Sequence, residues 1–108
     1  MKFSLYGYEW EIDFVDKDDK ELDGAWGICL NYKMKILIRK DLNEQLIKEC
    51  IIHELTHAVL LIQGRGGPQK FDLEDLCEFI GFCGENIINI ANMIYREYNR
   101  NPEIYEKR

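Results

Sequence analysis

The stretch that most constrains the fold of this chain runs from Ile51 to Leu61 and contains His-Glu-Leu-Thr-His at positions 53–57. On an α-helix, residues four apart lie one above the other, so His53 and His57 can share one metal ion if this stretch is helical. Glu54 lies about 100° around the helix from His53, where its carboxylate reaches a water on the ion without being a ligand. The spacing therefore predicts a helix that carries a metal site.

The residue types point to zinc. Neutral imidazoles suit Zn²⁺, and two of them leave room for a third protein ligand and a water. A carboxylate beside that water can take its proton. We therefore predict His53 and His57 as zinc ligands and Glu54 as the general base. The alternative is a helix that has this spacing by accident.

The surroundings of the motif predict that this helix is buried. Apolar side chains cover nearly every side of it, and a helix that is apolar all round is buried. Asp41 and Glu44 form an acidic variant of the capping box, which predicts a start near Leu42, and Gly64 is placed to end the helix. The apolar positions are Leu46, Ile47, Cys50, Ile51, Ile52, Leu55, Ala58, Val59, Leu60 and Leu61.

The remaining segments predict strands before this helix and a second helix after it. Residues 2–15 alternate between two faces, and Trp26–Leu30 and Met34–Arg39 flank a short polar connection, which indicates a strand and a β-hairpin. Residues 65–70 are rich in chain-breaking residues, and a helix is expected over 72–98, stopped by Asn101-Pro102. The charged tail after Pro102 is expected to fray.

These elements predict one small α+β domain over residues 1–108, with a three-stranded, mainly antiparallel sheet packed on two long helices. The chain has 108 residues and 46% hydrophobic residues, enough for one modest core.

Composition narrows the possible partners and compartment. The formal net charge is −6 and no basic face is evident, so we expect no nucleic acid partner. No apolar run approaches the roughly 20 residues that span a bilayer, and the N-terminus lacks a secretory signal, so we expect no membrane association and a cytoplasmic location. The four cysteines lack the spacing of a zinc knuckle and are expected to be free thiols. Residues 16–21 lack the calcium-loop pattern and are expected to form a solvated turn.

A third zinc ligand is needed, and the second predicted helix offers acids. On a helical wheel, Glu74 and Glu78 line one flank of its apolar face, whereas Asp75 points away from it. Either Glu74 or Glu78 is therefore a candidate from position alone.

With this pair of acids after H-E-x-x-H, the chain resembles the gluzincin class of zinc metallopeptidases. Asp23-Gly24, the hairpin with Gly27–Leu30 and Asp41-Leu42 are also similar to small metallopeptidases of phage and prophage genomes. The resemblance implies that Glu74 binds zinc, that Glu78 orients His53, and that the strand at about Ala25–Leu30 forms the rim of the cleft.

Two functions follow as expectations. The first is zinc-dependent hydrolysis of a peptide or protein substrate, with Glu54 as general base. The alternative is a zinc-stabilised binding or regulatory module with little or no catalytic activity, which the shortness of the chain favours. An intact Glu54 favours the enzyme, because a purely structural zinc site does not need a carboxylate there.

Overall fold

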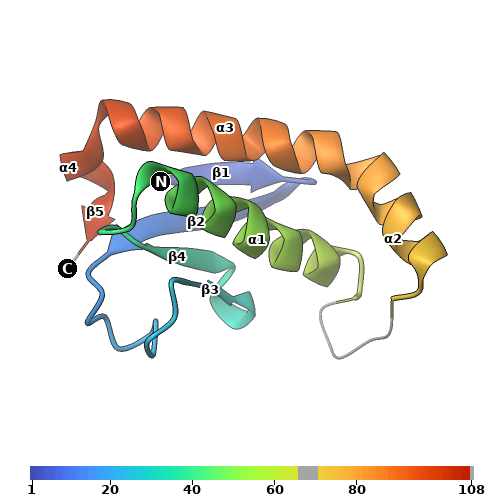
Figure 1. Cartoon of the computed structure of the whole chain (residues 1–108), viewed down its shortest axis with the longest axis horizontal. Coiled ribbons are helices and arrows are strands. Elements are labelled where there is room, and N and C mark those ends of the chain that lie inside the picture. The colour runs from blue at the N-terminus through green and yellow to red at the C-terminus, as the bar shows by residue number, and fades with distance from the viewer. Residues whose placement is uncertain (66–70, 108) are drawn as a thin grey trace.

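A computed structural model describes residues 1–65 and 71–107 of the chain. It confirms the α+β class, with a mixed sheet covered by helices (Figure 1). The strands are β1 (Lys2–Leu5), β2 (Tyr8–Val15), β3 (Gly27–Leu30), β4 (Lys35–Arg39) and β5 (Glu106–Lys107), and a 3₁₀ turn, η1 (Asn31–Lys33), joins β3 to β4. The helices are α1 (Glu44–Ile62), α2 (Leu73–Phe79), the π-helical turn η2 (Ile80–Gly84), α3 (Glu85–Arg100) and α4 (Pro102–Tyr105).

The sheet is not the three-stranded, mainly antiparallel one expected from the sequence, because its described part has five strands. Its strand order is β1-β2-β4-β3, and the central pair, β2 and β4, is parallel. The chain leaves β2, crosses to the edge of the sheet to form β3, and returns through the hairpin to place β4 beside β2. The consecutive apolar residues Ile36, Leu37 and Ile38 are all buried, as expected for a strand covered on both faces.

The first expected strand is in fact a hairpin. Tyr6 and Gly7 both have positive φ angles, +49° and +84°, and form the two-residue turn between β1 and β2. Phe3 and Leu5 are buried before the turn, whereas Tyr6 in the turn and Tyr8 after it are 46% and 50% exposed.

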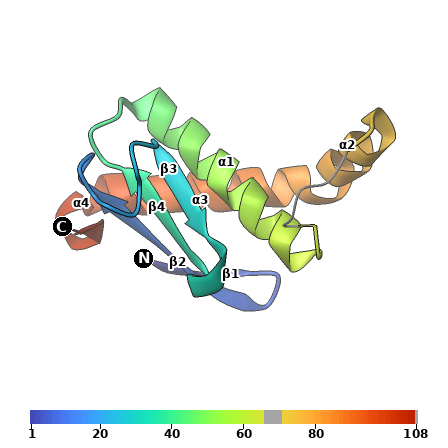
Figure 2. The same ribbon diagram turned by 90° about the horizontal axis from the view of Figure 1, so that it is seen from below.

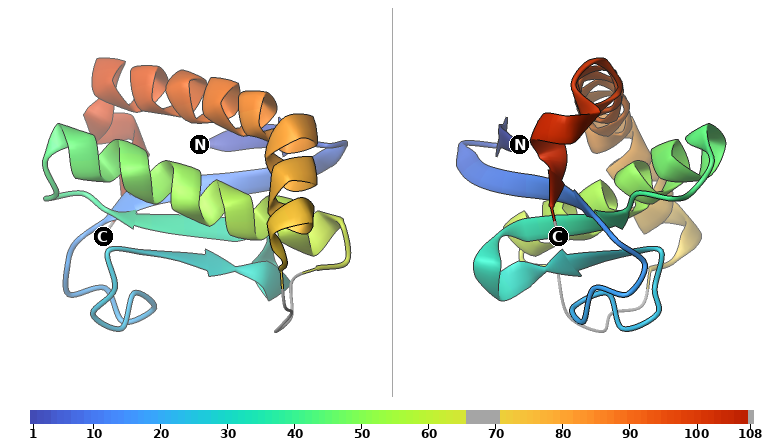
Figure 3. Two further views of the ribbon diagram at one scale, coloured as in Figure 1. Left: turned by 45° about the vertical axis from the view of Figure 1, so that its right-hand side comes forward. Right: turned by 90° about the vertical axis from the view of Figure 1, so that its left-hand side faces the viewer.

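Helices α1 and α3 lie on the same side of the sheet and run in opposite directions along it (Figures 1 and 3). Their buried faces and those of β1, β2 and β4 form the main core, in which the ring of Tyr98 stacks on Phe14 with centroids 3.7 Å apart. On the opposite side of the sheet, the loop between β2 and β3 brings Leu22 against Val15 and Leu37 in a smaller apolar cluster.

The ends of α1 show why the start of the helix was predicted two residues too early. Asn43 is the N-cap, and its side chain accepts a hydrogen bond from the backbone N–H of Leu46 at 3.0 Å. Asp41 forms an ion pair with Arg39 instead of capping the helix. Gly64, with φ of +76°, follows the helix end as predicted.

The second long helix is continuous from Leu73 to Arg100 but contains the π-helical turn η2. Helix α2, which precedes this turn in the chain, projects past the sheet (Figure 2). The apolar side chains of this helix are therefore not all covered: Ile87, Ala91 and Ile94 are buried, whereas Leu73, Leu76 and Ile80 are exposed.

The C-terminal tail does not fray over its described part. Asn101 ends α3 as expected, but residues 102–105 form α4, and β5 then pairs in parallel with β2. The hydroxyl of Tyr98 donates a hydrogen bond to Glu106 at 2.6 Å, which fastens this segment to α3. The expected linker at 65–70 lies, from residue 66 onward, outside the described residues.

No helix in the described part of the chain is long and apolar enough to cross a membrane. The four cysteines are free thiols, as predicted.

Candidate metal centre

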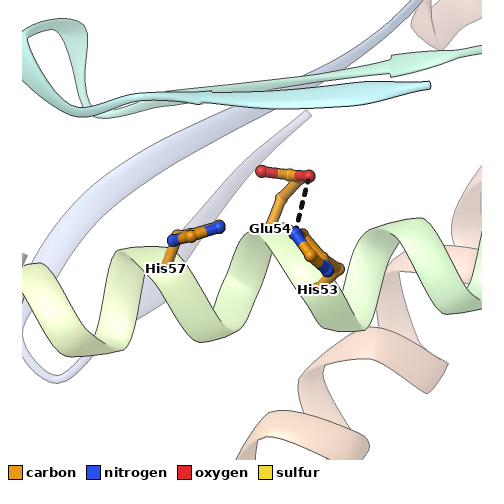
Figure 4. Close-up of side chains that lie close together, drawn as sticks. All are labelled: His53, Glu54 and His57. Atoms are coloured by element: carbon orange, nitrogen blue, oxygen red, sulfur yellow. Dashed lines mark ion pairs between the residues drawn. The ribbon is translucent and has the colours of Figure 1, made fainter. Parts of the chain in front are cut away.

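The H-E-x-x-H motif lies on α1, as predicted, where the helix passes beside the edge strand β3 (Figure 4). His53, Glu54 and His57 each offer a ligand atom, and these atoms lie within 4.8 Å of one another. The two imidazole rings have centroids 5.0 Å apart, and Nε2 of His53 lies 3.9 Å from Oε2 of Glu54. Two neutral nitrogen donors and an adjacent carboxylate are a donor set that fits zinc.

The three side chains differ sharply in burial. The His53 side chain is 68% exposed, whereas that of Glu54 is 8% exposed. The sequence predicted that the whole helix is buried, and this is wrong for the face that carries the histidines. The helix buries Ile51, Leu55 and Ala58 against the sheet, and the solvent-facing side presents polar residues.

Glu54 is buried because it lies against the backbone of β3. A Cβ atom built on Gly27 would lie 3.3 Å from both Cγ and Oε2 of Glu54, and 3.2 Å from Cδ1 of Ile38. An added side chain at this position would therefore require Glu54 or Ile38 to shift by a few tenths of an ångström. The sequence pattern gave Gly27 no such role, because its contact with Glu54 joins residues 27 positions apart.

Burial raises the pKa of the Glu54 carboxyl, and the positive charge available on His53 and His57 acts in the opposite direction. A carboxylate removed from water holds a proton more readily than an exposed one. Glu54 is therefore suited to accept a proton and to release it again, which a general base and acid must do.

The site opens into a groove between α1 and β3, which we call the site groove. Two hollows of about 370 and 280 Å³ form it, and both are lined by Gly27, His53 and Glu54. The first extends to Trp26, Glu49 and Cys50, and the second extends to Ile28, Cys29, Asn31 and His57. β3 is the edge strand of the sheet and pairs with β4 alone among the described strands.

Cys29 lies in the site groove but is poorly suited to act as a nucleophile or as a metal ligand. Burial, together with the nearby negative charge of Glu54, raises the pKa of its thiol to about 12. Its Sγ donates a hydrogen bond to Oδ1 of Asn31 at 3.2 Å. The thiol is therefore protonated at neutral pH, whereas metal binding requires the thiolate.

The structure does not bring Glu74 or Glu78 to the histidines. Both are exposed on α2, and in the part of the chain that is described, His53, Glu54 and His57 are the only cluster of metal-ligating side chains. Glu78 instead lines a small hollow with Gln63 and Arg65 at the far end of α1. The assignment of Glu74 as third ligand stays a prediction.

A larger hollow of about 530 Å³ lies between α1 and the second long helix, where α2 passes through η2 into α3. It is lined mainly by apolar side chains, including Ile52, Leu60, Leu76 and Ile80, and by a single acid, Glu85. It contains no cluster of metal-ligating side chains among the described residues, whereas the site groove contains His53, Glu54 and His57.

No protein-family model matches this chain, and no curated protein or solved structure matches it.

Proposed function

We propose that this protein is a zinc-dependent peptidase in which Glu54 acts as general base. The observation that carries the proposal is the placement of Glu54. Its carboxylate is buried against Gly27, yet it lies with both imidazoles inside a group whose ligand atoms are within 4.8 Å of one another.

Each residue has a distinct role in the proposed reaction. His53 and His57 would hold the ion, with Glu74 as the third ligand and Glu78 as the hydrogen-bonding partner of His53. When bound, zinc supplies Lewis acidity, which acidifies a water and polarises a peptide carbonyl. Glu54 takes the proton of the attacking water and later delivers it to the leaving amine.

The site groove suits an extended peptide. β3 presents one edge without a strand partner among the described residues, and His53 and His57 face the groove beside it. A substrate backbone can add to such an edge as a further strand, which would carry its carbonyl groups past the histidines.

The same placement favours an enzyme over a zinc-stabilised binding module. A structural zinc site is closed by its ligands and needs no further carboxylate. Burying a carboxylate that has no compensating partner is unfavourable, because the charged group loses its hydration. Glu54 is buried beside an accessible pair of histidines, which is the arrangement that general base catalysis requires.

The test is Glu54→Gln, which keeps the size of the side chain but cannot accept a proton. We expect the variant to fold and to retain zinc, while hydrolysis of the peptides cut by the wild type falls about 10²- to 10⁴-fold. Glu44→Gln is the matched control, since Glu44 is an exposed acid in the first turn of the same helix.

Two results would overturn the proposal. If the wild type with full zinc cleaves nothing in a broad peptide library, the protein is not a peptidase. If Glu54→Gln loses its zinc, Glu54 supports the metal centre itself and is not assigned as the base.

A further inference from the structure

We propose that the hollow between Trp26 and Glu49 binds a positively charged side chain, arginine or lysine, of the substrate. The inference rests on the proposed function, because the hollow is one end of the same site groove. It assigns basic polypeptides as the substrate class, which the H-E-x-x-H motif does not specify.

The hollow is continuous with the metal centre. It measures about 370 Å³, and its lining includes His53 and Glu54 as well as Trp26, Glu49 and Cys50. Because the neighbouring hollow shares Gly27, His53 and Glu54, a peptide lying along β3 would pass both. A side chain of that peptide next to the reacting bond would enter the Trp26 hollow.

The walls of the hollow suit a long side chain with an apolar stem. Trp26 precedes β3 and is 49% exposed, although an indole is usually well covered in a folded protein. Cys50 adds a buried, weakly polar surface on the α1 side. The methylene groups of arginine or lysine can pack along such a surface while the charged head stays at the rim.

The charge at the rim is negative. Glu49 lies four residues before His53, so both project from one face of α1 into the groove. Over the described residues, no lysine or arginine forms an ion pair with Glu49, although Lys48 beside it in sequence is paired with Glu44. A guanidinium or ammonium group in the hollow would meet the carboxylate of Glu49 and the face of the Trp26 ring together.

The same features act against other side chains. An acidic side chain would meet the like charge of Glu49. A neutral aliphatic or aromatic side chain could contact Trp26 but would gain no charge interaction with Glu49, which is exposed to water. The net charge of −6 also attracts basic polypeptides over a longer range.

The first test measures cleavage by the full-length, zinc-loaded protein. On matched peptides that differ at one position, we expect arginine or lysine to be preferred over leucine and glutamate at a fixed distance from the cut bond. Glu49→Gln should reduce the preference over leucine about fivefold or more while cleavage of the leucine peptide persists. Glu49→Lys should shift the preference towards glutamate, and Glu44→Gln should change nothing.

The second test does not depend on catalysis. The chain has two tryptophans, and Trp10 is 1% exposed whereas Trp26 is 49% exposed, so their indole N–H signals in an NMR spectrum report on different places. We expect a short peptide containing arginine to shift the Trp26 signal and leave that of Trp10 in place. The same peptide with citrulline, which has the shape of arginine without its charge, should shift Trp26 much less.

The outcomes separate this inference from the proposed function. Cleavage without a preference for basic residues overturns the inference and leaves the peptidase proposal standing. If no peptide is cleaved, the peptidase proposal fails, and the Trp26 signal still decides whether the hollow binds a cation. Equal shifts with arginine and citrulline, or no shift with either, contradict the inference.

Discussion

Gly27 is the residue on which the position of Glu54 depends. A methyl group at this position would lie 3.3 Å from the Glu54 side chain and 3.2 Å from Ile38, closer than side chains ordinarily approach. Since the carboxylate is already buried, it can move only by a small displacement within the site. In the proposed reaction, the alignment of Glu54 with the attacking water would therefore be sensitive to a single added carbon.

We predict that Gly27→Ala retains zinc but loses activity by about tenfold or more, since displacements approaching 1 Å can cost about 100-fold in rate. The added methyl should destabilise the fold by about 1–2 kcal/mol, the scale of modest overpacking. Zinc content, thermal unfolding and hydrolysis are measured together. Gly81→Ala is the control, since nothing lies within 4 Å of its added carbon. Unchanged hydrolysis in Gly27→Ala would contradict the role given to Gly27.

Cys29 gives a prediction from its raised pKa. Because that pKa is about 12, the thiolate fraction at pH 8 is roughly one in ten thousand in the metal-free protein. Thiolates react with alkylating reagents and thiols do not, so Cys29 should be modified very slowly at pH 8. Cys77, which is exposed, serves as the internal reference in the mass spectrum. Modification of Cys29 as fast as Cys77 would show that the thiol is not held in its protonated form.

At the residue scale, contacts within one helix could be predicted from the sequence, whereas contacts between distant segments could not. The separation of His53 and His57 is a local property of a helix, so the sequence alone predicts that they share a face. The contact between Gly27 and Glu54 depends on which strand lies over α1, and no local pattern carries that information. Glu49, which lines the site groove, was missed for the same reason, whereas Trp26 lies in the segment Ala25–Leu30 that the resemblance placed at the rim of the cleft.

At the scale of elements, helix ends and turns account for most of the differences between expectation and structure. Asp41 and Asn43 are both good capping residues, and Arg39 decides between them by pairing with Asp41. The turn at Tyr6 and Gly7 was overlooked because apolar and aromatic residues continue through it, which imitates one long strand. Gly64 was placed correctly, since a positive φ at a helix end is a strong local signal.

In the proposed metal centre, the third ligand would come from helix α2. Neither Glu74 nor Glu78 lies with the histidines in this structure, so a role for Glu74 requires α2 to lie closer to them when zinc is bound. Glu74→Ala should then weaken zinc affinity more than Glu78→Ala, which removes only a partner of His53 and should cost about 10- to 100-fold. Competition with a chromophoric chelator measures both affinities.

Glu103→Ala is the control for that comparison, because Glu103 is an exposed acid in the short helix α4. A larger loss in Glu78→Ala would exchange the two roles. Affinities equal to the wild type in both variants would place the third ligand elsewhere.

At the scale of the whole molecule, the class of the fold was predictable but the strand order was not. Alternating segments before a helical half indicate an α+β domain from sequence alone. The parallel pairing of β2 with β4 results from the path of the chain between β2 and β3, which passes to the edge of the sheet. That path places β3, with Gly27, beside Glu54. Under the proposed function, it determines which strand would receive a substrate.

We propose that His53 and His57 hold one zinc ion, and the metal content of the purified protein is the measurement that decides this. Untagged protein, purified without added metal and then exchanged into buffer with equimolar zinc, is measured by mass spectrometry for zinc per chain. We expect about one zinc per chain in the wild type and in Lys48→Ala, an exposed position on the same helix, and none retained in His57→Ala. A His57→Ala variant that keeps a full equivalent of zinc, or a wild type that binds none, would contradict the assignment of His53 and His57 as zinc ligands.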